Sequence, residues 1–298
     1  MNSLVDNKIF ILFCVLLVVI LWSANFIFIK FVLNDFEVFT ALFYRLMLVA
    51  IILLPFVKKP QKSEYIILGL TTIVLVPGHY GLLFLSLMST TSVGSISVVI
   101  QLSIPFSVLL AWVFYKDYPG YLRLTGLSIS FIGIVALFYE PSMFDNLGAL
   151  SLGTGSALCL GLYFNLVKKI RKLSSLGIIA YTSLLGLPCL FFLMLFNGES
   201  LSSVFEIQSK LAWSSFLFTV VGSSIIGHGL WAWLAKYQSI SLISPFLLLV
   251  PVLAVALSAI VFNEIVTLYF IMTSSIIIFG IFLVFMAKQN PSLSKENV

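Results

Sequence analysis

Three side chains that can carry a charge fall well inside long apolar runs of the sequence. Arg45 and His79 lie 7 and 8 residues from the nearer ends of their runs, and His228 lies 7 residues from the end of its own. All eleven Asp and Glu residues fall instead in loops, in tails or at the ends of runs. Because an ionisable group inside a membrane is costly, these three residues are the first candidates for function if the runs cross a bilayer.

Arg45 supports the sharpest hypothesis. Its planar guanidinium could hold a substrate carboxylate through two parallel hydrogen bonds. In the competing interpretation the side chain extends to the nearer membrane surface, or it pairs with Glu37 or Glu140. The depth of Arg45 suits both interpretations.

The two histidines could titrate near neutral pH and take part in proton coupling. The alternative, which the glycines on both sides of His228 favour, is that each ring hydrogen-bonds a neighbouring span and sets helix packing. No carboxylate lies deep in the runs beside His79 or His228, and the motifs Gly-x-Ser-x-Gly and His-Glu-x-x-His are missing. The sequence therefore predicts no metal site, no cofactor and no enzyme activity.

Polar and aromatic residues inside the runs form a second candidate set, as the lining of a central cavity. A single amide in a span more often joins two helices, at about 0.6 kcal/mol, so the hypothesis concerns the set as a whole. Its members are Trp22, Asn25, Gln101, Tyr163, Asn165 and Trp231. Prolines inside runs free backbone carbonyls and can act as hinges. The candidate hinges are Pro77, Pro105, Pro245 and Pro251.

The elements that must position these residues are membrane-spanning helices. Hydrophobic residues make up 61% of the 298 positions and charged residues 9%, whereas soluble domains have about 45–50% and about 25%. Runs longer than about 18 residues can cross a hydrocarbon core of about 30 Å as helices. The expected spans are Ile9–Ile29, Val38–Val57, Tyr65–Leu87, Val93–Phe114, Tyr121–Tyr139, Leu147–Val167, Leu176–Phe196, Leu211–Ala235, Ile240–Phe262 and Ile265–Ala287.

The loops that join these spans are short, so any function must lie within the membrane. The basic residues predict the orientation, because Lys and Arg gather in cytoplasmic loops. With a cytoplasmic N-terminus, thirteen of the sixteen fall inside, Lys30 and Lys210 fall outside, and Arg45 lies within a span. Both termini are therefore expected in the cytoplasm. The net charge of +5 does not indicate a nucleic-acid partner, because no basic helix stands clear of the apolar runs.

The second half of the chain repeats features of the first. His79 and His228 are each followed by a proline, an acid and a glycine, at spacings of 26, 12 and 16 residues in one half and 23, 13 and 16 in the other. Five spans is an odd number, so a duplicated five-span unit enters the membrane in opposite orientations. The sequence thus predicts an all-α polytopic membrane protein of ten transmembrane helices, arranged as a 5+5 inverted repeat with units 1–140 and 141–298. Transporters with this architecture bind a small-molecule substrate near the midplane of the lipid bilayer.

The chain also resembles the drug/metabolite transporter superfamily, in its ten-span EamA branch. The resemblance covers nearly the whole chain and includes Lys30, Arg45 and three motifs. These motifs are Trp22-Ser23-Ala24-Asn25-Phe26, Gly227-His228-Gly229-Leu230-Trp231, and the stretch from Ser244-Pro245-Phe246 through Pro251 to Asn263-Glu264. The stretch from Pro245 to Glu264 is especially similar to the bacterial exporters of O-acetylserine and cysteine.

This resemblance implies two EamA repeats, a bacterial inner-membrane location and a cavity opened alternately to either side. It further implies efflux of amino acids or their derivatives, driven by protons. The sequence departs from common family patterns at Ser23, where glycine is frequent, and at His228, where tyrosine is frequent. The rival hypotheses are an importer of a nucleotide-like or cofactor metabolite and a membrane-embedded lipid-modifying enzyme.

Overall fold

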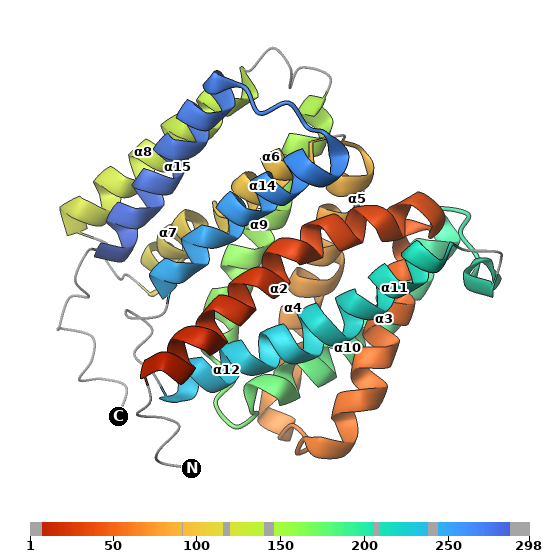
Figure 1. Ribbon diagram of the computed structural model, residues 1–298. Helices are drawn as coiled ribbons and strands as arrows, with labels where there is room; N and C mark the ends of the chain where they lie inside the picture. Colours follow the sequence, from red (N-terminus) through yellow and green to blue (C-terminus); the bar gives the residue numbers. More distant parts are fainter. Residues whose placement is uncertain are drawn as a thin grey trace.

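In the computed structural model, residues 8–90, 92–115, 120–139, 146–205, 209–237 and 244–286 are described, and these residues form helices and short loops only (Figure 1). The elements of the first half are α2 (Lys8–Asp35), α3 (Val38–Leu53), η1 (Leu54–Phe56), η2 (Lys62–Glu64), α4 (Tyr65–Ile73), η3 (Val74–Gly81), α5 (Leu82–Met88), α6 (Val93–Ile100), α7 (Ser103–Tyr115) and α8 (Gly120–Phe138). Those of the second half are α9 (Leu147–Val167), α10 (Ser175–Phe196), η5 (Leu201–Phe205), α11 (Lys210–Phe218), η6 (Thr219–Gly227), α12 (His228–Tyr237), η7 (Ser244–Leu248), α14 (Leu249–Phe262) and α15 (Leu268–Met286).

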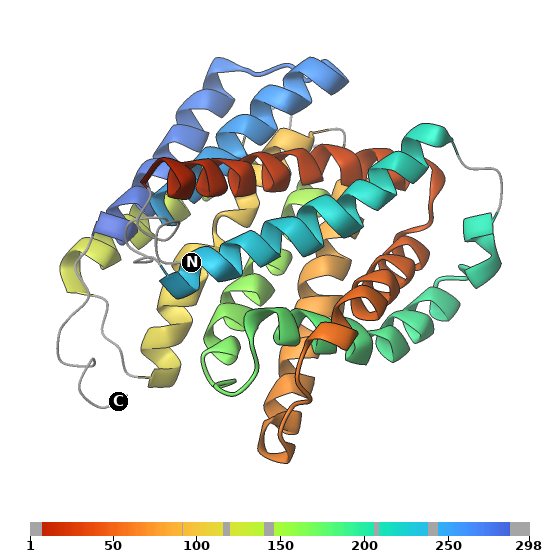
Figure 2. The same ribbon diagram turned by 60° about the horizontal axis from the view of Figure 1, so that its bottom comes forward.

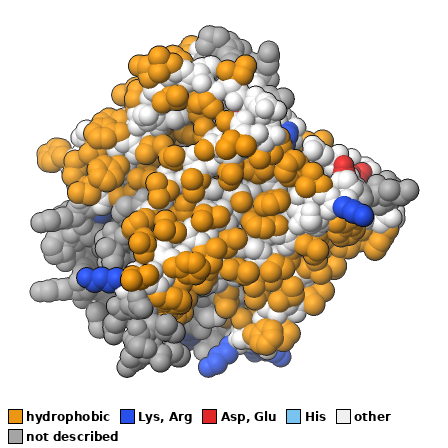
Figure 3. All heavy atoms as spheres, in the orientation of Figure 1, with side chains coloured by type: hydrophobic (Ala, Val, Ile, Leu, Met, Phe, Trp, Pro, Cys, Tyr) orange, Lys and Arg blue, Asp and Glu red, His pale blue; other side chains and the backbone are white. Residues whose placement is uncertain are grey.

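Each of the ten expected spans corresponds to helix in the described residues. Nine continuous helical stretches there are long and apolar enough to cross a membrane, and a shorter apolar helix covers Phe246–Phe262. Hydrophobic side chains cover most of the face shown in Figure 3, with basic residues at its margins. Large apolar side chains are exposed on this surface, with more than 60% exposure each for Phe13, Ile66, Ile132 and Phe196. Such a surface is unfavourable in water and is stable in contact with lipid. The prediction of an all-α polytopic membrane protein is confirmed.

The helix contacts repeat across the two halves, as an inverted repeat requires. Two helices pack against their own repeat partners, α3 against α10 and α8 against α15, and the fourth span packs against the ninth through α6 and α14. The first span, α2, packs against α11 and α14, and the two views of Figures 1 and 2 agree on its place beside α11 and α12. Its repeat partner α9 packs against α7 as α2 packs against α14, and against η3 as α2 packs against η6. These corresponding contacts fit a two-fold relation between the halves.

The third and eighth spans are interrupted at repeat-related positions. The third consists of α4, the π-helical segment η3 and α5, and the eighth of α11, the π-helical segment η6 and α12. His79 lies within η3, and His228 directly follows η6. A π-helical turn adds one residue per turn and is frequent at functional sites. The two segments rotate the side chains that follow them relative to a regular α-helix.

The fourth and ninth spans are also interrupted, and here the break precedes the proline. Pro105 is the third residue of α7 and Pro251 the third residue of α14. In the first turn of a helix the backbone N–H has no partner within that helix, so proline costs little there. Pro77 lies inside η3. Pro245 lies in the 3₁₀ segment η7, and its side chain is outside the described residues.

Glycines allow α8 and α15 to pack backbone to backbone. A Cβ atom on Gly280 would lie 2.6 Å from the carbonyl oxygen of Gly126, and one on Gly133 would lie 3.0 Å from the backbone nitrogen of Ile277. Small residues give membrane helices this close approach. The glycines of the repeated pattern, Gly133 and Gly280, are thus both part of this helix crossing.

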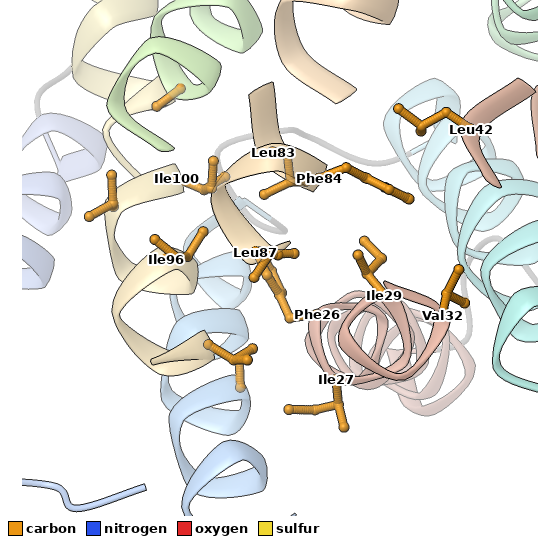
Figure 4. Packing of buried hydrophobic residues seen from close by; sticks show 14 of the residues in the cluster. Phe26, Ile27, Ile29, Val32, Leu42, Leu83, Phe84, Leu87, Ile96 and Ile100 are labelled. Carbon is orange, nitrogen blue, oxygen red and sulfur yellow. The ribbon is translucent and has the colours of Figure 1, made fainter. Parts of the chain in front are cut away.

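One part of the hydrophobic core lies where the first span meets the third and fourth. In Figure 4, Phe26 of α2 and Leu87 of α5 point toward each other, and both are buried. Ile96 and Ile100 of α6 lie nearby in the same cluster. This packing places one flank of α2 in the core, whereas Ile9 and Phe13 of the same helix are exposed.

Acidic side chains at one end of the bundle bind the N-termini of helices. Glu199, between α10 and α11, accepts hydrogen bonds from the backbone N–H groups of Phe39 and Thr40 at the start of α3, at 3.2 and 2.7 Å. Asp35 accepts from the N–H of Ser209 at 2.8 Å before α11. The first N–H groups of a helix lack partners within it and carry partial positive charge. We call this end of the molecule, which also holds Glu264, the acidic end.

Candidate functional site

Arg45 is buried at the centre of the helix bundle. Its side chain is 3% exposed, and its Nε and Nη2 atoms donate to Ser224 Oγ at 3.3 and 3.0 Å. The guanidinium carbon lies 5.6 Å from the ring centroid of Tyr80 and 5.8 Å from that of Phe84. Ser224 belongs to the π-helical segment η6, whereas Tyr80 belongs to η3. The arginine therefore joins the two interrupted spans.

Glu37, one of the two carboxylates proposed as a partner of Arg45, does not contact it. Glu37 accepts hydrogen bonds from Thr40, Ser200 and Ser203 at the acidic end, and Glu140 lies outside the described residues. Among the described residues, the only hydrogen-bond acceptor within reach of the guanidinium is the neutral hydroxyl of Ser224. A guanidinium with 3% exposure does not extend to the membrane surface either. A buried guanidinium without a charged partner among the described residues is a candidate for anion binding.

An aromatic group lies beside this arginine. The ring of Trp22, on α2, is 5.1 Å from that of His228 and 5.8 Å from that of Trp231, centroid to centroid. The Trp22 indole N–H is buried and has no hydrogen-bond partner among the described residues. A buried indole N–H usually finds an acceptor, so this donor is available to a ligand.

His79 is bound to its neighbouring helix. Ser156 Oγ on α9 donates to the His79 carbonyl at 2.9 Å and lies 2.8 Å from His79 Nδ1. Because the serine hydroxyl already donates to the carbonyl, it accepts a hydrogen bond from Nδ1–H. This reciprocal pair supports the packing interpretation of His79.

These groups form one cluster across the two halves of the protein. The charge of Arg45 is close enough to interact electrostatically with both imidazole rings and with Tyr80. Tyr163, on α9, interacts with Tyr80. We define the central cluster as the side chains of Trp22, Arg45, His79, Tyr80, Tyr163, Ser224, His228 and Trp231. It contains no acid, so its chemistry is that of a cationic, aromatic binding site.

Three sequence candidates stand apart from these contacts. Asn165 donates to the carbonyl and the hydroxyl of Ser107, at 2.9 and 3.1 Å, and thereby joins α9 to α7. Gln101 lies at the break between α6 and α7, and no described hydrogen bond links its side chain to the cluster. Asn25 is one helical turn from Trp22, and its buried Oδ1 atom has no hydrogen-bond partner among the described residues.

Sequence reasoning missed Tyr80 and Ser224. Tyr80 directly follows His79. Ser224 precedes His228 by four residues, a spacing that places Ser224 and His228 on one side of a helix. The four-residue spacing between Ser224 and His228 is visible in the sequence. The bond of Ser224 to Arg45 is not, because it depends on the contact between α3 and η6.

Gly227 gives a test of the cluster. A Cβ atom there would lie 2.8 Å from Trp22 Nε1, whereas one on Gly229 would meet only Leu176 Cδ2, at 3.7 Å. We expect Gly227→Ala to displace Trp22 and lower substrate affinity, since overpacking costs about 1–3 kcal/mol. Gly229→Ala, the matched control, should keep wild-type affinity. Equal affinities in both variants, measured by calorimetry in detergent, would mean that Trp22 is not part of the site.

The fold defines a polytopic helical membrane protein, and the central cluster lies between its two halves. The EamA-like transporter family matches this chain twice, over residues 9–139 and 147–286. The chain belongs to this family of transporters. The resemblance inferred from the sequence motifs is therefore confirmed.

Two bacterial proteins are similar along most of their length. A "Probable amino-acid metabolite efflux pump" of Salmonella typhimurium is 27% identical over 271 residues, which cover 86% of this chain and 88% of that one. A protein of the same description from Escherichia coli is 24% identical over 260 residues, covering 84% and 86%. A solved crystal structure matches with a TM-score of 0.62 at 12% identity, over 93% of this chain and 96% of the other. That likeness concerns the fold alone.

Proposed function

We propose that this protein exports amino acids or their derivatives across the bacterial inner membrane by alternating access, coupled to protons. The observation that carries the proposal is the buried Arg45 guanidinium, which has a neutral hydroxyl and no carboxylate as its described partner. A substrate carboxylate would supply the missing anion through two charge-assisted hydrogen bonds. The names of the two bacterial relatives favour amino-acid metabolites and efflux.

Trp22 of the central cluster, and Asn25 beside it on α2, suit the rest of such a substrate. Trp22 offers an unpaired indole N–H, and Asn25, one turn along α2, offers an unpaired carbonyl oxygen. These groups can bind an acyl oxygen and an ammonium group respectively. The rings of Trp22 and Trp231 can also attract an ammonium group through their faces.

Alternating access requires the two repeats to move against each other around the bound substrate. Arg45 of the first repeat and Ser224 of the second share a hydrogen bond at the centre. A carboxylate that competes with Ser224 for the guanidinium would weaken this link between repeats. Substrate binding thus favours rearrangement of the two halves, because it replaces a contact that holds them together.

His228 is expected to tune transport and not to act as an indispensable proton carrier. It stacks near Trp22, and no acid among the described residues lies beside it in the cluster. We expect His228→Tyr to fold and to retain a large part of the transport rate, since a tyrosine ring can also pack against Trp22. Complete loss of pH-driven transport, at normal abundance in the membrane, would instead make this histidine the proton carrier.

The orientation proposed here places both termini in the cytoplasm and the acidic end outside, as the distribution of Lys and Arg predicts. Ser202, in η5, and Lys169, in the turn after α9, are both exposed and lie at opposite ends of the bundle. A cysteine at position 202 should react with an impermeant thiol reagent in intact cells, and one at position 169 only after permeabilisation. The reverse pattern would invert the topology and remove the argument for export.

Two experiments test the proposed function. A thermal-shift screen of purified protein against amino acids, their acetylated derivatives and nucleotides identifies the substrate class, because a ligand at 100 times its Kd stabilises by about 2.7 kcal/mol. Cells that overproduce the protein should then release the identified compound faster than control cells. Stabilisation by nucleotides only, with faster uptake, would favour the importer hypothesis and overturn this proposal.

A further inference from the structure

Glu264 forms a junction between two interrupted spans at the acidic end. It follows Asn263, which ends α14 in the left-handed conformation with φ of 53°. Glu264 Oε1 accepts from the backbone N–H of Val93 at 2.6 Å, and Oε2 accepts from that of Gly94 at 3.2 Å. The loop after the ninth span therefore binds the N-terminus of the fourth.

Two hydroxyl groups and a lysine complete this junction. Ser258 Oγ donates to Glu264 Oε2 at 3.2 Å and Ser92 Oγ at 3.4 Å. Lys30 of α2 interacts electrostatically with Glu264, and its Nζ atom donates to the carbonyls of Leu87 and Thr90. Lys30 is the one ionisable side chain described as interacting with this carboxylate; the contacts from α6 and α14 are neutral. Spans one, three, four and nine thus meet at Glu264.

A change in the charge of the Glu264 carboxylate would weaken the contacts that hold this junction together. Hydrogen bonds to an ionised carboxylate are roughly twice as strong as neutral ones, and the positive end of a helix favours a negative charge. Protonation would remove the charge and turn one carboxyl oxygen into a donor. The contacts with Val93 and Gly94 would then weaken together.

The environment of Glu264 also raises the pH at which protonation takes place. Burial raises the pKa of the Glu264 carboxyl, and the hydrogen bonds from Val93, Gly94, Ser258 and Ser92 act in the opposite direction. The net shift is upward. Because the pKa of an acid is raised, the group takes up a proton at a higher pH than an exposed glutamate does.

We infer that Glu264 is the proton-binding site of the transporter and that its protonation releases α6 from α14, which opens the acidic end. This inference rests on the proposed function. If the acidic end faces the outside, protons taken up from that side favour the outward-open state of the carrier. The step transfers one proton to the carboxylate and involves no other reactant.

Glu199 provides a matched control at the same end. It binds the N-terminus of α3 through Phe39 and Thr40, and burial raises the pKa of its carboxyl also. Its charged neighbour is Glu37 and not a lysine, and it lies away from the junction of α6 with α14. Glu199→Gln should therefore leave the pH response of that junction unchanged.

The test follows the junction directly with spin labels. In a background without Cys14, Cys159 and Cys189, labels at the exposed positions Ser89→Cys and Ile265→Cys report the distance between the two loops. Lowering the pH from mildly alkaline to mildly acidic should lengthen this distance in the otherwise wild-type protein and in Glu199→Gln. Glu264→Gln, which mimics the protonated carboxyl, should hold the longer distance at every pH. Difference infrared spectra should show a carboxyl band that titrates over the same range and disappears in Glu264→Gln.

A pH-dependent distance that persists in Glu264→Gln, or a distance that never changes in wild type, would overturn the inference. A thermal-shift measurement with the identified substrate tests the proposed function independently of the pH response of the junction. Glu264→Gln is expected to bind that substrate, since its contacts lie at the end of the bundle and not in the central cluster. Loss of stabilisation by every amino-acid derivative in wild type, with the junction still responding to pH, would reject the proposed function alone.

Discussion

Arg45→Gln is expected to weaken binding of a carboxylate-bearing substrate by about 2–5 kcal/mol, or at least about 30-fold in Kd. The variant removes the positive charge and the planar pair of donors that a carboxylate would contact. Arg45→Lys keeps the charge but loses the planar geometry, so it should weaken binding less. Titration calorimetry on protein purified in detergent would measure all three affinities.

The carboxamide of the same substrate is the control for Arg45. It lacks the carboxylate charge, so wild type should bind it poorly, and Arg45→Gln should bind it about as well as wild type does. Both variants must also reach the membrane at normal abundance, because a purely structural arginine would lower protein levels instead. Unchanged affinity for the carboxylate in both variants would remove Arg45 from the substrate site.

Gly280→Ala is expected to lower thermal stability markedly. Its Cβ atom would lie 2.6 Å from both the Gly126 carbonyl oxygen and the Ser130 backbone nitrogen, and backbone atoms cannot rotate away. Such overpacking costs about 1–3 kcal/mol, here by forcing α8 and α15 apart. The apparent melting temperature in detergent should fall. Gly69→Ala, where no other atom lies within 4 Å, should melt at the wild-type temperature or above it.

A drop of equal size in both glycine variants would mean that α8 and α15 do not cross closely. The substrate affinity of Gly280→Ala, measured below its melting temperature, should stay near that of wild type. The crossing lies away from Arg45, so stability and binding are separable in this variant.

The sequence predicted the architecture because the bilayer restricts the choice so strongly. Long apolar runs such as Leu147–Val167 must be helices in lipid, and the repeated pattern around His79 and His228 requires inverted halves. Gly133 and Gly280, which the repeated pattern relates, both lie in the contact between α8 and α15. The length of an apolar run and the spacing of repeated residues are local properties of the chain, so the sequence shows them directly.

The interior of the spans was less predictable. The π-helical segments η3 and η6 carry no residue pattern that separates them from α-helix, because tertiary packing selects them. Pro105 and Pro251 were predicted to interrupt spans and to act as hinges; the structure places each in the first turn of a new helix, α7 and α14. Sequence alone cannot place a helix start that depends on contacts with another span.

The candidate site was predictable as a set of residues but not as a set of contacts. The sequence singled out Arg45, Trp22 and His228 because charged and polar groups are rare in spans, and the three lie together. Ser224, the partner of Arg45, is an ordinary span serine until the two helices meet. Likewise, the capping role of Glu264 depends on a contact with residues about 170 positions earlier.

Transport by the purified protein tests the central claim most directly. Proteoliposomes loaded with the unlabelled amino-acid derivative found by thermal shift are diluted into the same compound carrying a radioactive label. We predict that label enters by exchange, saturates with concentration, and enters much more slowly with Arg45→Gln at equal protein content. Entry of label no faster than into protein-free liposomes, for every amino acid and derivative that stabilises the protein, would contradict the claim that the central cluster binds and carries these substrates.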